Sequence, residues 1–302
     1  MIKQPFKKPT TFEEQLERLK SRGLTVKDEK HALDVLRHKN YYRLRAYAIF
    51  LEQEKDAFIP GTTFEQIETL YNFDRTLRAL CMQATAAIEI SLRTQFAYQA
   101  AHATNSSIPH EDEALFSGYF KGFASYHDFK QKKINELILS SKELFIVHHR
   151  HYYDNFPVIP VWAMVEVITF STLVSLYRHI AKSIKNAVRK AYGAPSFKIL
   201  DNWFYLCCVI RNTCAHHSSL WIKSFPNFIT PGKNNENNRA NFWQVILMLY
   251  TLLSHISSEE AESFKTSLVT LTKDTSAAIP QLNICEKMHF PADWEKQITP
   301  YW

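Results

Sequence analysis

The chain has 302 residues, of which 46% are hydrophobic and 22% are charged, and its formal net charge is +6. This composition allows a sizeable core and argues against disorder. Only six glycines occur, which weighs against dinucleotide-binding, P-loop and all-β folds, because those folds need glycine in tight turns.

The ends and the cysteines indicate a soluble cytoplasmic protein. The N-terminus is charged and lacks the apolar stretch of a secretory signal. The longest apolar stretch, residues 242–253, is shorter than the roughly 20 residues that cross a membrane. The five cysteines form an odd set without a C-x₂-C pair, which favours free thiols in a reducing compartment.

Capping boxes mark the first helices. Thr11–Glu14 predicts a helix that stops at Gly23, and a second helix is expected over residues 27–39. Thr63–Gln66 opens a segment without Gly or Pro that reaches about Ala103. Because about 40 residues exceeds the usual helix length, this segment is either one long spine or two helices with a bend.

The rest of the chain also reads as helical, and the class is all-α. Helices are expected over residues 126–150, 161–193, 242–257 and 259–273, and another begins at residue 196 and ends within 211–217. A loop is expected over residues 224–241. The tail is expected to be extended and packed through Phe290, Trp294 and Trp302. We predict a helical extension over residues 1–60, a helical domain over 61–279 and a packed tail over 280–302.

Positive charge is concentrated in one stretch. Residues 167–235 contain nine basic side chains and one acid, Asp201, so this stretch nets +8 and the remainder −2. Arg178, Lys182, Lys185 and Arg189 are spaced 4, 3 and 4, which predicts one basic helix face. This face either is merely solvated or holds an RNA backbone; the absence of neutralising acids at i+4 favours the RNA interpretation.

The segment 211–217 carries the chemistry, because it combines Arg211, Asn212, His216 and His217 at the end of an apolar helix. RNA can be cut without a metal when a histidine moves the proton of its 2′-hydroxyl and an arginine stabilises the charge on the phosphate. Asn212 and His216 are i, i+4, so the amide can orient that imidazole if the helix continues.

The spacing leaves alternatives open. On a straight helix Arg211 and His216 lie about 140° apart. Either the helix breaks inside the motif, or a second copy completes the site in a symmetric homodimer. The histidine could also be an ordinary core residue. A zinc site from Cys207, Cys208, Cys214, His216 and His217 is a weaker alternative, because the paired spacing of zinc ligands is missing.

The motif resembles the R-N-x₃-H signature of HEPN-domain ribonucleases and, more narrowly, the bacterial Abi-like abortive-infection proteins of the AbiD and AbiF type. One departure is Ser171, where a glycine is usual after Phe170. Other elements follow in the expected order: Thr11–Gln15 with Arg22–Leu24, Tyr41–Leu44, Phe58–Phe64, Leu70–Arg78, Ile88–Arg93, Pro160–Trp162 with Glu166, and Phe290–Trp294.

The resemblance implies a HEPN-type helical bundle that cleaves single-stranded RNA without metal or cofactor, in anti-phage abortive infection or as a toxin. The implied partners are RNA, a second copy of the chain in a homodimer, and an antitoxin. No contact with a membrane is implied. Arg211 and His216 would be the catalytic pair, with Asn212 as the orienting residue and His217 as the alternative imidazole. Four further residues would support the motif helix through buried ion pairs: Asp74, Arg75, Glu89 and Arg93. The alternative is that these four form structural salt bridges with no role at the motif.

Two other functions stay possible at this level. A non-catalytic RNA-binding module could hold a regulatory RNA on the same basic surface, with the motif merely ending a helix. A zinc-dependent nuclease ranks third.

Overall fold

The computed structural model of the chain describes residues 8–225, 227–232 and 239–302. Within these residues nearly all regular structure is helical, and β1 (Glu52–Glu54) pairs antiparallel with β2 (Ala57–Phe58) in a two-stranded ribbon. The predicted all-α class is therefore confirmed.

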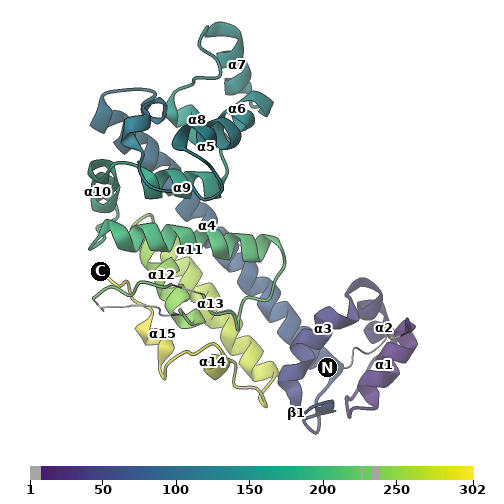
Figure 1. Ribbon diagram of the computed structural model, residues 1–302. Coiled ribbons are helices and arrows are strands. Elements are labelled where there is room, and N and C mark those ends of the chain that lie inside the picture. Colours follow the sequence, from purple (N-terminus) through teal and green to yellow (C-terminus); the bar gives the residue numbers. More distant parts are fainter. Residues whose placement is uncertain (1–7, 226, 233–238) are drawn as a thin grey trace.

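The helix α4 (Phe64–Thr104) is the spine of the molecule (Figure 1). Its 41 residues form one unbroken helix of about 60 Å, so the long-spine alternative is correct. Thr63 and Gln66 satisfy each other's backbone amides in the predicted capping box, and the helix ends at Asn105 with a φ of 49°. Helices from the N-terminal, middle and C-terminal parts of the chain pack against it.

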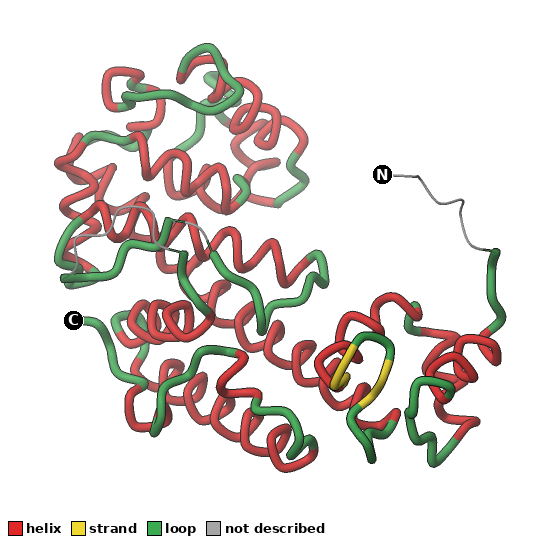
Figure 2. The backbone as a smooth tube through the Cα atoms, turned by 60° about the horizontal axis from the view of Figure 1, so that its bottom comes forward, coloured by secondary structure: helices red, strands yellow, loops and turns green. Residues whose placement is uncertain are grey.

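The N-terminal elements gather at the start of α4. Figure 2 shows them as a group beside the small ribbon, apart from the C-terminal helices. Thr11 caps α1 in the predicted capping box, and Thr25 bridges to Thr63 at the start of α4. The helices are α1 (Phe12–Lys20), α2 (Glu29–His38), α3 (Tyr41–Ala48) and the 3₁₀ turn η1 (Ile49–Leu51).

The opposite end of α4 carries short helices, and here two predicted helices are broken. The helix expected over 126–150 is interrupted at 141–143, and the one expected over 161–193 is interrupted twice. Ile168 and Ile180 are extended, and Thr169 caps a new helix by accepting the amide of Thr172. The elements are η2 (Pro109–Glu111), η3 (Glu113–Leu115), α5 (Tyr126–Lys130), the π-helical η4 (Gln131–Asn135), α6 (Glu136–Ser140), α7 (Leu144–Tyr152), α8 (Val161–Val167), α9 (Phe170–His179) and α10 (Lys182–Ala191).

Three long helices, α11 (Phe197–Ala215), α12 (Phe242–Ser254) and α13 (Ser258–Ala278), pack beside the middle of α4 (Figure 1). Ser196 caps α11 as expected. Most of α12 is buried, because it is apolar on nearly every side. These helices hold the end of α11 against the spine.

The tail is packed as expected but is not wholly extended, since it contains the single-turn helices α14 (Ile284–Lys287) and α15 (Trp294–Gln297). Phe290 and Trp294 are buried. Trp302 stacks on Trp203 with ring centroids 4.8 Å apart, and its indole donates to the carbonyl of Tyr192 at 2.9 Å. Of the helices in the described ranges, none has the length and apolar character that crossing a membrane requires.

Candidate active site

The helix α11 ends inside the 211–217 motif. His216 is the C-cap, and His217 follows in the left-handed region with a φ of 55°. The amide of His217 donates to the carbonyl of Cys214, and the amide of Ser218 to that of Thr213, each at 3.1 Å. This is a Schellman termination. The helix break comes only at His216 itself, so both imidazoles are exposed beyond the last turn, and no hydrogen bond joins Arg211 to His216 among the described residues. Completion of the site by a second copy therefore stays a prediction.

The segment after the histidines is anchored to other helices. Arg43 of α3 donates to the carbonyl of His217 at 2.9 Å. Asp74 of α4, which is fully buried, accepts the backbone amides of Leu220 at 3.0 Å and Trp221 at 3.1 Å. The segment that follows α11 is therefore held by α3 at His217 and by α4 at Leu220 and Trp221.

Arg211 and Asn212 lie on the last turns of α11. The Oδ1 atom of Asn212 accepts from the Arg211 guanidinium at 3.2 Å, and its Nδ2 lies 3.8 Å from the Cys208 Sγ. The expected hydrogen bond from Asn212 to the His216 imidazole is not among those of the described residues. Burial raises the pKa of the Cys208 thiol to about 11; the positive charge of Arg211 opposes this shift and the negative charge of Glu89 adds to it.

An exposed stripe runs along α11. Tyr205, Asn212 and His216 are separated by seven and four residues, so they lie within about 40° of each other over about 16 Å. Tyr205 and His216 are exposed. The guanidinium of Arg178 lies 5.4 Å from the centroid of the Tyr205 ring. One side of α11 thus carries an aromatic ring, a half-buried amide and an imidazole, with the Arg178 guanidinium of α9 beside the ring.

The four predicted RNA-binding residues do not share one helix face, and this prediction is wrong. Because the chain is extended at Ile180, Arg178 ends α9 while Lys182, Lys185 and Arg189 belong to α10. Arg178 and Lys182 are exposed. Lys185 is buried, pairs with Asp201 and donates to the Arg178 carbonyl at 3.0 Å.

Arg189 makes a local contact, since it donates to the Ala194 carbonyl at 2.8 Å and so ties the end of α10 to the next turn. Lys233, one of the nine basic residues in this stretch, lies outside the described residues.

The predicted supporting residues separate into two ion pairs. Asp74 pairs with Arg78, not with Arg75, because residues four apart share a helix face and adjacent ones do not. Arg75 is exposed. Glu89 pairs with Arg93, which also donates to the carbonyl of Val165 and so ties α8 to α4.

The cysteines do not converge with the histidines. All five are free, and Cys207 is fully buried whereas His216 and His217 are exposed. Within the described part of the chain, no group of three or more His, Cys, Asp or Glu side chains is placed to hold a metal ion.

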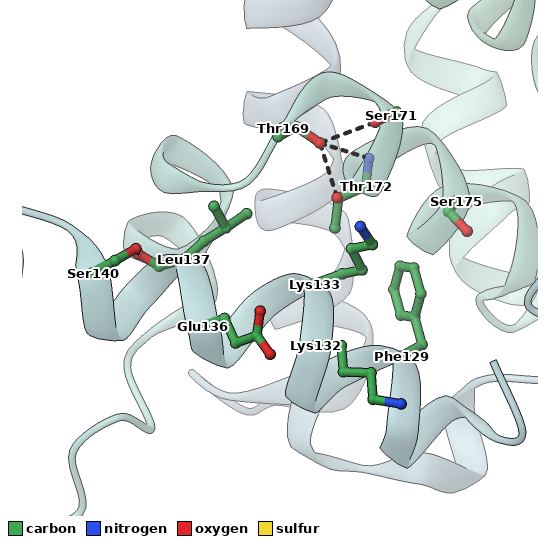
Figure 3. A pocket seen from close by; sticks show the side chains of 10 residues that line it. All are labelled: Phe129, Lys132, Lys133, Glu136, Leu137, Ser140, Thr169, Ser171, Thr172 and Ser175. Carbon is green, nitrogen blue, oxygen red and sulfur yellow. Dashed lines mark hydrogen bonds between the residues drawn. The ribbon is translucent and has the colours of Figure 1, made fainter. Parts of the chain in front are cut away.

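A pocket of about 690 Å³ lies away from the motif, between α5–α6 and the start of α9 (Figure 3). Lys132 and Lys133 line one side, but Lys132 is paired with Asp128. On the other side the Thr169 hydroxyl is bonded to the hydroxyls of Ser171 and Thr172. Because these polar groups satisfy one another, the end of α11 is the better candidate for chemistry.

Sequence reasoning missed several neighbours of the motif. Arg78 was identifiable from its i+4 spacing to Asp74. The contacts of Arg43 and Lys223, which donates to the Thr213 hydroxyl at 2.8 Å, depend on how distant segments pack.

The model of a family described as "Abi-like protein" matches residues 34–222 of the chain. The matched region runs from α2 through α4 and α11 to just beyond the motif. No curated protein and no solved structure matches the chain.

Proposed function

The chain belongs to the Abi-like protein family, since the match covers more than half of its length, and from this premise we propose that it is a HEPN-type endoribonuclease. Family membership points to abortive infection. The proposal adds that the protein cleaves single-stranded RNA without a metal ion, as an anti-phage effector or toxin.

The stripe along α11 is the observation that carries this proposal. It joins an exposed imidazole at His216 to an amide at Asn212 and to a ring under the Arg178 guanidinium. Aromatic rings and arginines are the groups on which single-stranded bases and phosphates lie. An extended RNA strand along this stripe would bring a phosphodiester to the motif.

In the proposed reaction the 2′-hydroxyl of the RNA is the nucleophile. One imidazole accepts the proton of this hydroxyl as its oxygen attacks the phosphorus, and a second proton donor protonates the departing 5′-oxygen. The products are a 2′,3′-cyclic phosphate and a 5′-hydroxyl. Arg211 would stabilise the negative charge that builds on the phosphate oxygens, and Asn212 would hold the Arg211 guanidinium through the 3.2 Å hydrogen bond.

A homodimer would complete the site. Arg211 and His216 leave α11 in directions about 140° apart, and no hydrogen bond joins their side chains among the described residues. Two motifs facing each other across a twofold axis would supply both proton-transfer groups and two guanidinium groups.

Cleavage of a labelled single-stranded RNA by purified protein in excess chelator tests the proposal. We expect wild type to release fragments with 2′,3′-cyclic phosphate ends, and Arg211→Ala and His216→Ala to lose about 100-fold or more of the rate, as general acid–base and charge-stabilising groups do. Matched controls are Arg37→Ala on α2 and His151→Ala on α7, both exposed and outside the motif.

Two outcomes would contradict the proposal. If wild type and both motif variants bind RNA equally and leave it intact, the protein is a binding module that holds a regulatory RNA. If activity disappears in chelator and returns with zinc, the reaction depends on a metal.

A further inference from the structure

A pocket of about 310 Å³ opens between α4 and α8, on residues that the proposed reaction does not use. Its aromatic walls are unusually open to solvent: Trp162 is 55% exposed and Tyr98 is 57% exposed. Large aromatic side chains are buried on average. The pocket is also lined by Arg93, Thr94, His102 and Glu166.

The pocket is lined partly by α4, and the motif lies on α11, which packs against α4. Arg93, in the pocket wall, pairs with Glu89. Along α4, Arg93 and Tyr98 lie about 6 Å and 14 Å beyond Glu89. An RNA strand that follows α4 away from the motif would bring a further nucleotide to the pocket.

The side chains in the pocket fit a flat, hydrogen-bonding ring. Unpaired bases stack on aromatic side chains and are read at their Watson–Crick edges. The Tyr98 ring is itself supported by the His102 ring, with centroids 4.2 Å apart. Trp162, at the start of α8, also lines the pocket.

Glu166 is the carboxylate among the residues that line the pocket, and it is exposed. Its carboxylate only accepts hydrogen bonds, and it takes part in no ion pair among the described residues. Guanine presents two adjacent N–H donors, N1–H and the N2 amino group, on its Watson–Crick edge. Adenine and cytosine place an acceptor beside one donor group, and uracil flanks one donor with two acceptors. Two adjacent donors match the two oxygens of a carboxylate.

We propose that this pocket binds an unpaired guanine of the RNA, stacked between Trp162 and Tyr98 with its Watson–Crick edge on the Glu166 carboxylate. The proposal rests on the ribonuclease function and deepens it by naming a base of the RNA that the protein recognises. The specificity of cleavage is then set by α4 and α8, outside the catalytic motif.

Binding of 2′-O-methyl RNA hexamers to the full-length chain tests the pocket without cleavage, because the 2′-O-methyl group removes the nucleophile. Each hexamer carries one guanosine, inosine or adenosine among uridines. We expect about tenfold tighter binding of the guanosine hexamer than of the adenosine hexamer, with inosine, which lacks the N2 amino group, in between. Glu166→Gln should reduce this preference to about twofold or less.

The stacking residues have a different signature. Trp162→Ala and Tyr98→Ala should each weaken binding of every hexamer by roughly tenfold while leaving the ratio between bases closer to wild type than Glu166→Gln does. Glu136→Gln on α6 and Tyr152→Ala on α7 are matched controls, because both side chains are exposed and lie outside the pocket. Equal affinity of wild type for all three hexamers, or a guanine preference that survives Glu166→Gln, would overturn the proposal.

The two proposals fail separately. A guanine preference in binding without cleavage of unmodified RNA would retain the pocket and remove the nuclease. Cleavage that depends on Arg211 and His216 but shows no base preference would retain the nuclease and remove the pocket.

Discussion

The Asp74 carboxylate, in the first half of α4, accepts the backbone amide of Leu220 at 3.0 Å, three residues beyond His217. The same carboxylate accepts the amide of Trp221, the hydroxyl of Tyr47 at 2.6 Å and the guanidinium of Arg78. One buried charge therefore joins α3, α4 and the segment that leaves the motif. The position of the two exposed histidines depends on this contact.

We predict that Asp74→Asn lowers the free energy of unfolding by about 3–5 kcal/mol, because it leaves the buried Arg78 guanidinium without its counter-charge. Urea unfolding followed by circular dichroism measures the change. Asp34→Asn, which removes the exposed partner of Arg37, is the control and should change stability by less than about 1 kcal/mol. Equal effects of the two variants would show that Asp74 does not organise this region.

The left-handed backbone at His217 gives a second prediction. Glycine adopts a φ of 55° without the steric cost that a Cβ atom brings. His217→Gly should therefore raise the free energy of unfolding by about 1 kcal/mol, whereas His217→Ala, which keeps a Cβ atom, should not.

The same two variants identify the catalytic imidazole. If His216 is the catalytic residue, His217→Gly retains RNA cleavage while His216→Ala loses it. Loss of cleavage in His217→Gly and His217→Ala, with His216→Ala active, would assign the role to His217. A decrease in the stability of His217→Gly would contradict the strain argument.

Sequence reasoning succeeded where the signal is local and failed where it depends on distant packing. The caps at Thr11, Thr63 and Ser196 act on amides within three residues, so their helices begin where predicted. The break at Ile180 is different: this residue pairs with Phe116 as an isolated bridge, which no local pattern reveals.

The candidate site shows the same division. That Arg211, Asn212 and the two histidines gather at one helix end follows from their spacing. Two other features follow only from how α4 and α11 pack against distant segments. They are the hydrogen bond that the Leu220 amide donates to Asp74 and the burial of Lys185. A stripe of basic residues in the sequence therefore overstated the basic surface.

A third prediction separates the exposed basic residues from the buried one. Arg178→Ala should reduce the salt dependence of RNA binding by about one unit of log K per log salt, as loss of one phosphate contact does, with little effect on folding. Lys185→Met should instead lower the free energy of unfolding by about 3 kcal/mol, because it leaves Asp201 in a site where burial already raises the pKa of its carboxyl.

For both variants, RNA binding measured at increasing KCl concentration gives the salt dependence, and urea unfolding gives the stability. Lys190→Ala, an exposed change on α10, is the control for any loss of charge. A reduced salt dependence in Lys185→Met together with unchanged stability would mean that Lys185 reaches the RNA after all.

The buried His110 predicts how the stability of the fold changes at acidic pH. It is 1% exposed, and neither ring nitrogen has a hydrogen-bond partner among the described residues. Burial lowers the pKa of its imidazole to about 4, with the Glu111 carboxylate opposing the shift and Lys130 adding to it. In the unfolded chain the pKa of histidine is about 6.5. The unfolded state therefore binds a proton more readily than the folded state between these two values.

Stability from this residue should accordingly be complete above about pH 6.5 and should decrease as the pH falls toward 4, by about 3 kcal/mol in total. His110→Leu should flatten the pH dependence of the unfolding free energy over this range, since leucine fills the same apolar site without titrating. His151→Leu, at an exposed position of α7, is the matched control and should retain the wild-type pH dependence. Urea unfolding at half-unit steps from pH 4 to 7 measures all three proteins. If His110→Leu shows the same decrease as wild type, the acid sensitivity comes from other groups and His110 is hydrated in the folded protein.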